Sequence, residues 1–132
     1  MDNLKSLSIL AAALGIAWLG GALAGEDSDY SNKWRIECSG RAQGEGDIHF
    51  RVTPKEGEET EVDVAISQGR SENDVAHDIR DAFQSQLSPQ RYHVESDDGE
   101  DVLIKVKEGT PDFSLVLVES TVEHVRLHLQ RE

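Results

Sequence analysis

Cysteine is almost absent from this chain, because Cys38 is the only one in 132 residues. An internal disulfide is therefore impossible, and a small exported domain without such crosslinks must rely on its apolar core. Cys38 shares one side of an alternating strand pattern with Trp34 and Ile36. This position favours a buried, unreactive thiol. A disulfide to another molecule is the alternative.

Aromatic and basic side chains are also scarce. Aromatic residues make up only 5% of the chain, which leaves little surface on which a base or a sugar could stack. Thirteen lysine and arginine residues stand against 26 acidic ones, and the formal net charge is -13. This excess repels nucleic acid and anionic membrane surfaces. The acidity complements a basic protein partner or suits a saline habitat, and its spread over turns and polar faces favours the saline habitat.

The motifs of common catalytic and nucleotide sites are missing. No GxSxG nucleophile elbow occurs, and the glycines of residues 40–46 form neither a Walker nor a GxGxxG pattern. His49, His77 and His93 stand singly at polar-facing positions. We therefore expect a protein that is not an enzyme and has no cofactor.

Two histidines near the end of the chain are the remaining catalytic candidates. His124 and His128 are four residues apart, which places both on one face of the strand predicted there. Side chains at this spacing on a strand lie about 13 Å apart, too far for one zinc ion to bridge. An enzyme that uses one of them is our third hypothesis, and the sequence offers no partner residue for it.

One acidic cluster is the basis for the only metal-binding site that we predict. Asp97, Asp98, Glu100 and Asp101 surround Gly99, and oxygen ligands of this kind suit calcium. The spacing does not match the EF-hand loop. An Asp-Gly pair between two strands also explains the stretch as the tip of a hairpin. These four residues are weak candidates for an outward-facing cation site.

The start of the chain has the pattern of a targeting segment. Residues 7–23 are apolar and uncharged, Lys5 precedes them, and Ala22-Leu23-Ala24 resembles a signal peptidase site. We predict a Sec signal peptide over residues 1–24, cleaved after Ala24, and a periplasmic or secreted product without a stable membrane anchor. An uncleaved anchor is the alternative, which glycines within the run and the lack of flanking basic clusters disfavour. Residues 25–32 are then a flexible lead.

Residues 33–132 are long enough for one domain. Apolar residues alternate with polar ones over several short stretches, as in strands with one buried face. Apolar residues recur every four positions over residues 71–87, which predicts a single amphipathic helix that begins at Ser71. The predicted strands span residues 33–39, 47–53, 61–67, 92–96, 101–107, 113–119 and 122–130.

These elements predict an α+β fold with the order β-β-β-α-β-β-β-β. We expect a single antiparallel β-sheet of about six to seven strands, with the helix packed on one face. Residues 113–119 are apolar on both sides, which suggests a central strand covered twice or a strand at an interface. The leading functional hypothesis is an exported protein-binding or envelope-assembly module, whose partner is another protein or a second copy. The alternative is a periplasmic domain that binds a small ligand or a divalent cation.

Overall fold

The structure is a computed structural model, and it describes residues 29–132. The predicted signal peptide and the first part of the predicted lead, residues 25–28, lie outside the described residues. The predicted order of elements is confirmed. It runs β2 (Lys33–Ser39), β3 (Gly46–Pro54), β4 (Thr60–Ile66), α1 (Glu72–Gln86), β5 (Tyr92–Asp97), β6 (Asp101–Val106), β7 (Phe113–Ser120) and β8 (Arg126–Arg131).

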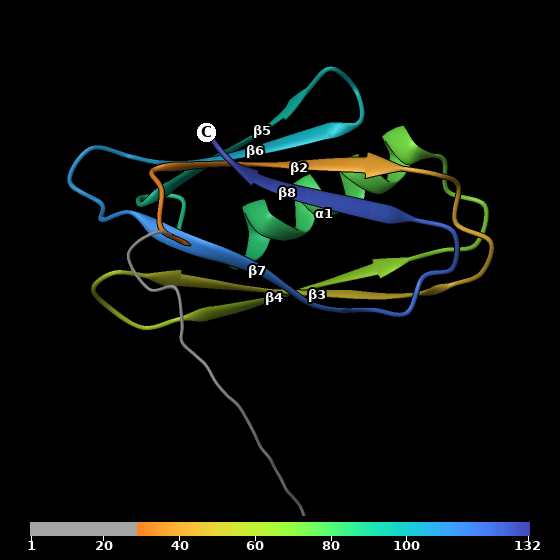
Figure 1. Cartoon of the computed structure of the whole chain (residues 1–132), viewed down its shortest axis with the longest axis horizontal. Helices are drawn as coiled ribbons and strands as arrows, with labels where there is room; N and C mark the ends of the chain where they lie inside the picture. The colour runs from red at the N-terminus through yellow and green to blue at the C-terminus, as the bar shows by residue number, and fades with distance from the viewer. Residues whose placement is uncertain (1–28) are drawn as a thin grey trace, which may run out of the picture.

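The strands form two antiparallel sheets, so the prediction of a single sheet was wrong. One sheet has four strands in the order β5-β6-β2-β8, and the other has three in the order β4-β3-β7. Figure 1 shows the sheets one above the other, with α1 behind the space between them. Four connections pass from one sheet to the other: β2 to β3, β4 through α1 to β5, β6 to β7, and β7 to β8.

The burial pattern explains why one sheet does not suffice. Each strand of the three-stranded sheet has one buried face, and a single 15-residue helix cannot cover seven such strands. Packing two sheets with their apolar faces together buries all of them. The alternating pattern read from the sequence is the same for one covered sheet and for two facing sheets. It therefore could not distinguish the two arrangements.

Helix α1 begins where the sequence predicts. The Ser71 hydroxyl accepts a hydrogen bond from the backbone N–H of Asp74 at 3.2 Å, and the Asp74 carboxylate accepts one from the Ser71 N–H, so a complete capping box forms. Its apolar side is buried and consists of Val75, Ala76, Ile79 and Phe83. Within the described part of the chain, no helix has the length and apolar character needed to cross a membrane.

The helix closes one side of the molecule by covering two strand edges. It packs against β4, the edge strand of one sheet, and β5, the edge strand of the other. The side-chain amide of Gln86 bonds to the backbone of Asp63 in β4, and that of Gln84 donates to the backbone carbonyl of Val94 in β5. Each edge therefore has one residue bonded to a side chain of α1, which helps to protect it from pairing with another strand.

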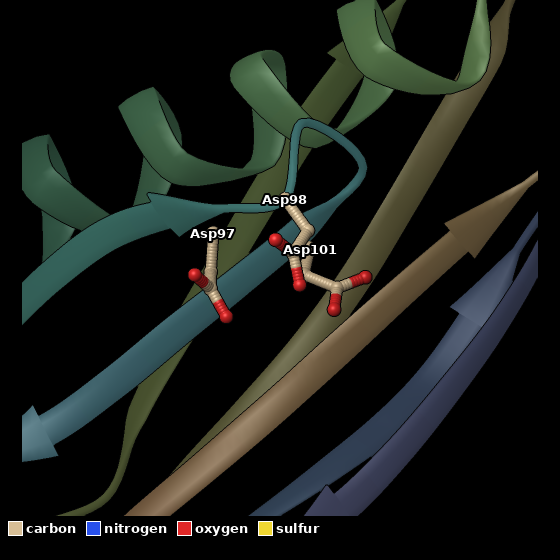
Figure 2. A group of neighbouring side chains, drawn as sticks. All are labelled: Asp97, Asp98 and Asp101. Atoms are coloured by element: carbon tan, nitrogen blue, oxygen red, sulfur yellow. The ribbon is translucent and has the colours of Figure 1, made fainter.

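The hairpin between β5 and β6 carries the predicted acidic tip. Asp98 and Gly99 have φ angles of 53° and 78°, and this left-handed conformation is easiest for glycine and tolerated by aspartate. Figure 2 shows Asp97, Asp98 and Asp101 grouped around this turn. The Asp-Gly signal thus gave the hairpin and its position correctly.

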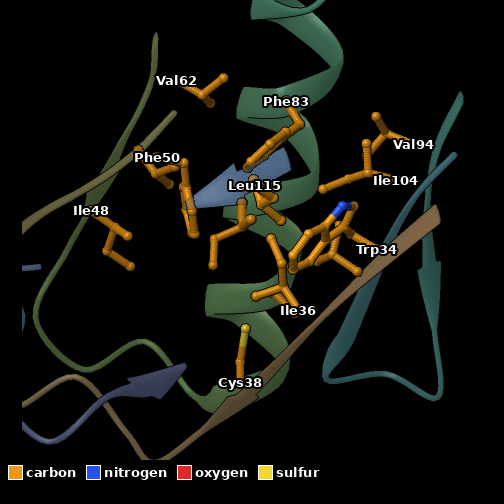
Figure 3. Close-up of a cluster of buried hydrophobic side chains, with 14 of the residues drawn as sticks. Trp34, Ile36, Cys38, Ile48, Phe50, Val62, Phe83, Val94, Ile104 and Leu115 are labelled. Atoms are coloured by element: carbon orange, nitrogen blue, oxygen red, sulfur yellow. The ribbon is translucent and has the colours of Figure 1, made fainter. Parts of the chain in front are cut away.

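The core lies between the two sheets and against α1. Figure 3 shows side chains from both sheets meeting there. The ring centroids of Phe50 and Phe83 are 5.1 Å apart, and the ring planes are inclined at 60°. Trp34 donates from its indole N–H to the carbonyl of Phe113 at 2.9 Å, a buried bond that joins the sheets. Cys38 is 2% exposed and belongs to this core, which confirms the prediction of a buried thiol.

Two strand predictions near the end of the chain were wrong in detail. β7 is an edge strand and not a central one, and its second apolar side, at Val116 and Val118, faces outward. β8 begins at Arg126 and not at residue 122, because residues 121–125 form the turn that leads from one sheet to the other. His124 lies in this turn with a φ of 72°, so it does not share a strand face with His128.

Candidate functional site

Three of the four predicted metal candidates lie close together. Each of Asp97, Asp98 and Asp101 has a carboxylate oxygen within 4.8 Å of the others, and Glu100 is not part of the group. The pairing of Asp97 with Asp101 across the hairpin brings the first and last together. Carboxylate oxygens at this separation could share a hard cation such as calcium.

Arg35 already compensates two of these carboxylates. Its Nη1 lies 2.8 Å from Asp97 and 2.6 Å from Asp101, and its Nε donates to Glu132 at 2.7 Å. The hydrogen bonds that Arg35 donates to the carboxylates of Glu132, Asp97 and Asp101 together raise its pKa. Asp101 is only 6% exposed, the one buried charged residue within residues 29–132. The guanidinium therefore serves as the fixed cation of this cluster and ties the hairpin tip to the end of the chain.

A hollow of about 490 Å³ adjoins the cluster at Asp101. Glu37 lies between Asp101 and His128 in the register of three neighbouring strands, and all three line it. The other lining residues are Cys38, Ser39, Glu72, Glu100, Arg126 and Leu127. Burial raises the pKa of Cys38 to about 12, so its thiol is protonated at neutral pH and is a poor nucleophile. The hollow thus combines acidic side chains with an unreactive cysteine.

The predicted catalytic histidines are not brought together by the fold. His128 contacts Gln130 on its own strand at 3.1 Å, while His124 lies in the turn before that strand. The enzyme hypothesis depended on one of these rings having an acidic or nucleophilic partner. His128 has Glu37 opposite it on β2, but neither side chain is bonded to a nucleophile.

His49 is the histidine with the strongest charged partners, and sequence reasoning missed it. Its Nδ1 contacts Asp63 and its Nε2 contacts Glu61, both on the neighbouring strand β4. Asp63 and then Glu61 raise the pKa of His49, while the Arg51 guanidinium, 2.8 Å from Glu61, lowers the pKa of that carboxyl. The alternating patterns of β3 and β4 indicate that these polar side chains face the same side of the sheet. Which of them are neighbours depends on the register of the two strands, which the sequence does not give.

The outer face of the three-stranded sheet also carries the two exposed large apolar residues of the described part of the chain. Val116 and Val118 on β7 are 46% and 43% exposed. A register shift between His49 and Phe50 places Glu119 opposite His49, so Val118 is the extra residue of a bulge. Beside Val118 lies an open hollow of about 580 Å³, lined by Asp47, His49, Asp63, Val118, Glu119 and Thr121.

The backbone of β7 is paired with a strand along one edge only. β3 occupies that edge, and on the other Ser31 alone exchanges two backbone hydrogen bonds with Phe113, at 2.9 and 3.0 Å. Alternate residues of an antiparallel strand direct their N–H and C=O groups to the same edge. Those of Leu115 and Leu117 therefore point the same way as those of Phe113. Within residues 29–132 no strand pairs with them there.

The sequence matches no protein-family model and no curated protein.

Proposed function

We propose that this chain is an exported, non-enzymatic domain that binds another protein or assembles into a larger envelope structure. The observation that carries the proposal is the open edge of β7, where two exposed valines, Val116 and Val118, lie beside unpaired strand backbone. Natural proteins commonly protect edge strands, and α1 protects β4 and β5 in this way. An edge left open with apolar side chains suits recognition by strand addition.

Other observations support a binding role over catalysis. The one cysteine is buried and protonated at neutral pH, and His49 has both ring nitrogens engaged by carboxylates. Export belongs to this proposal through the signal pattern of residues 1–24. A periplasmic or secreted location would bring the open edge into contact with envelope or extracellular proteins.

Photocrosslinking in living cells tests the proposal. A photoreactive amino acid replaces Val118 in the full-length chain, and in a control it replaces Glu58, which lies in the exposed turn between β3 and β4. The expected result is a discrete crosslinked band from position 118 that is missing from position 58, in the envelope or secreted fraction. Equal labelling from both positions, or none from either, would contradict a binding role for β7.

Divalent-cation binding at the hairpin tip is the second candidate function. It is favoured by one observation, the grouping of Asp97, Asp98 and Asp101 within 4.8 Å. We place it second because Arg35 already neutralises two of the three carboxylates. Calorimetry with calcium and with zinc tests it, with Asp98→Asn as the comparison variant. A binding heat that disappears in this variant would support the site, and no heat together with an unchanged melting temperature would exclude it.

A further inference from the structure

On one side of the molecule, α1 forms hydrogen bonds with an edge strand of each sheet. On the other side β7 and β8 lie near each other as the edge strands of different sheets and are not paired. The Glu132 N–H donates to the Lys33 carbonyl at 3.0 Å, which shows that even-numbered residues of β8 direct their backbone groups toward β2. The backbone groups of Leu127 and Leu129 therefore face the same open side as those of Leu115 and Leu117.

The edge of β7 already accepts a strand-like partner at one position. Ser31 forms an antiparallel bridge to Phe113 through both of its backbone groups. The next pairing positions along β7 are Leu115 and Leu117. Next to this edge the inward-facing side chain of Leu115 is buried, while four others are partly exposed: Leu117, Val125, Leu127 and Leu129. A strand added here would thus need apolar side chains on its inner face.

The outer face of the sheet beside this edge is suited to a different kind of side chain than the inner face. Val116 and Val118 offer apolar contact, and the adjoining hollow offers the carboxylates of Asp47, Asp63 and Glu119. No lysine or arginine lines this hollow, and its one histidine is engaged with Asp63. Lysine and arginine have long apolar stems that can lie along valines while the charged end reaches carboxylates. A basic residue therefore fits the outer face.

Electrostatic repulsion disfavours two other segments that could pair with the β7 edge, which are the residues before Ser31 and a second copy of this chain. The residues that precede Ser31 in the sequence include Glu26, Asp27 and Asp29, which have the same sign as the hollow. A second copy of this chain would bring together two molecules of net charge -13 and would place no added cation in the hollow. Like charges brought together in this way oppose association, whereas opposite charges favour it.

We propose that β7 binds an extended segment of another protein, antiparallel to it, with apolar residues facing inward and lysine or arginine facing outward. This proposal rests on the proposed protein-binding function and names the chemistry of the partner. The added strand forms main-chain hydrogen bonds with Leu115 and Leu117, while its outward basic side chains contact the hollow at Glu119.

Binding of two synthetic peptides to the full chain tests the proposal. One peptide alternates valine and lysine over eight residues, and its counterpart alternates valine and glutamate. Fluorescence anisotropy measures affinity, and amide hydrogen exchange locates the binding strand. We expect the lysine peptide to bind and to slow exchange at Leu115 and Leu117. We also expect its affinity to fall as salt is added, since exposed charges are screened.

Two charge-reversal variants distinguish an effect of Glu119 itself on peptide affinity from an effect of the net charge of the chain. Glu119→Lys should weaken the lysine peptide about fivefold, the upper range for an exposed ion pair. Glu58→Lys makes the same change of net charge in a remote turn and should leave the affinity nearly unchanged. The proposal would be overturned if the two reversals had equal effects or if the lysine peptide did not bind. It would also be overturned if the glutamate peptide bound equally well, or if the peptide slowed amide exchange at residues away from β7.

Two further results test separately which molecule binds the β7 edge and whether this chain has a protein-binding function. A concentration-dependent dimer in sedimentation, lost in Val118→Lys, would identify a second copy as the occupant and overturn the basic partner. Failure of the lysine peptide together with a specific crosslink from position 118 would reject this partner chemistry while leaving the protein-binding function in place. Failure of both would remove both proposals.

Discussion

The side chain of Gln86 forms with Asp63 the pair of hydrogen bonds that a neighbouring strand would form. Its Oε1 accepts from the Asp63 N–H at 3.0 Å and its Nε2 donates to the Asp63 carbonyl at 2.8 Å. A helix side chain thereby takes the place of a strand at the edge of β4. Gln84 forms a single bond to the backbone carbonyl of Val94 in β5, so two side chains of α1, on different faces of the helix, bond to the edge strands of both sheets.

Replacing this amide should expose the β4 edge. Gln86→Ala removes both bonds, and we expect a loss of about 2 kcal/mol in the free energy of unfolding, because each of the two neutral bonds contributes about 1 kcal/mol. Exchange of the Asp63 amide should accelerate, since its acceptor is gone. Urea denaturation and amide hydrogen exchange measure the two effects. Gln90→Ala, in the exposed loop after the helix, is the control. Unchanged exchange at Asp63 would contradict the assignment.

Removal of Arg35 should leave a buried carboxylate without its cation. For Arg35→Met we expect a loss of about 3 kcal/mol, in line with breaking a buried ion pair from one side. The variant should also gain a calcium response: calcium on the order of a millimolar should raise its melting temperature by joining Asp97 and Asp101. Thermal unfolding with and without calcium measures both effects. Arg131→Met, at an exposed position of β8, is the matched control.

The His49 cluster should make stability depend on pH. Asp63 and Glu61 raise the pKa of His49 above its ordinary 6.5, so the protonated ring stabilises the fold fully below about 6.5. This contribution is lost as the pH rises through the folded-state pKa. The pKa of Glu61 is lowered from 4.5, mainly by Arg51, so its contribution is present above about 4.5 and is lost in acid.

Urea midpoints between pH 5 and 9 measure this dependence. The native chain should lose stability above about pH 6.5, and His49→Gln should lose less over the same range. His128→Gln replaces a histidine on the other sheet and should keep the slope of the native chain. Proton NMR titration of the His49 ring measures its pKa directly, and an ordinary value would contradict the ion pairs.

Cys38 should be inert in the folded chain. Its burial raises the pKa to about 12, and we expect iodoacetamide at pH 8 to modify it only after denaturation. Ser39→Cys, placed in a Cys38→Ala background, provides an exposed thiol one residue away on the same strand and should react readily. Mass spectrometry measures the extent of reaction. Cys38→Ser should cost about 1–3 kcal/mol, because it buries a hydroxyl in the core.

Local signals in the sequence predicted the elements well. The alternation of residues 33–39, the Ser71 cap with its four-residue apolar repeat, and the Asp98-Gly99 turn each correspond to the observed element. Each of these signals depends only on residues that are close together in the chain, so it can be read from the sequence without knowing the fold. The start of β8 was misjudged because Val122 and Val125 continue the apolar pattern through a turn.

The arrangement of strands and the sites depended on contacts between distant residues. Arg35 meets Asp97 and Asp101 across two strand pairs, and His49 meets Asp63 only in one particular register. A shift of one residue would turn either side chain to the opposite face. The acidic tip was therefore located from sequence, whereas its compensating arginine was not. The same limit concealed that residues 113–119 form an edge strand.

The closure of β4 and β5 by α1 has a consequence for growth by strand pairing. A protomer whose sheets are open at two opposite edges can add neighbours without limit, as fibrils do. Here α1 packs against β4 and β5 and bonds to one residue of each, whereas the described residues provide no such helix beside β7 and β8. We therefore expect strand addition at β7 to give finite complexes and not a growing strand-paired chain.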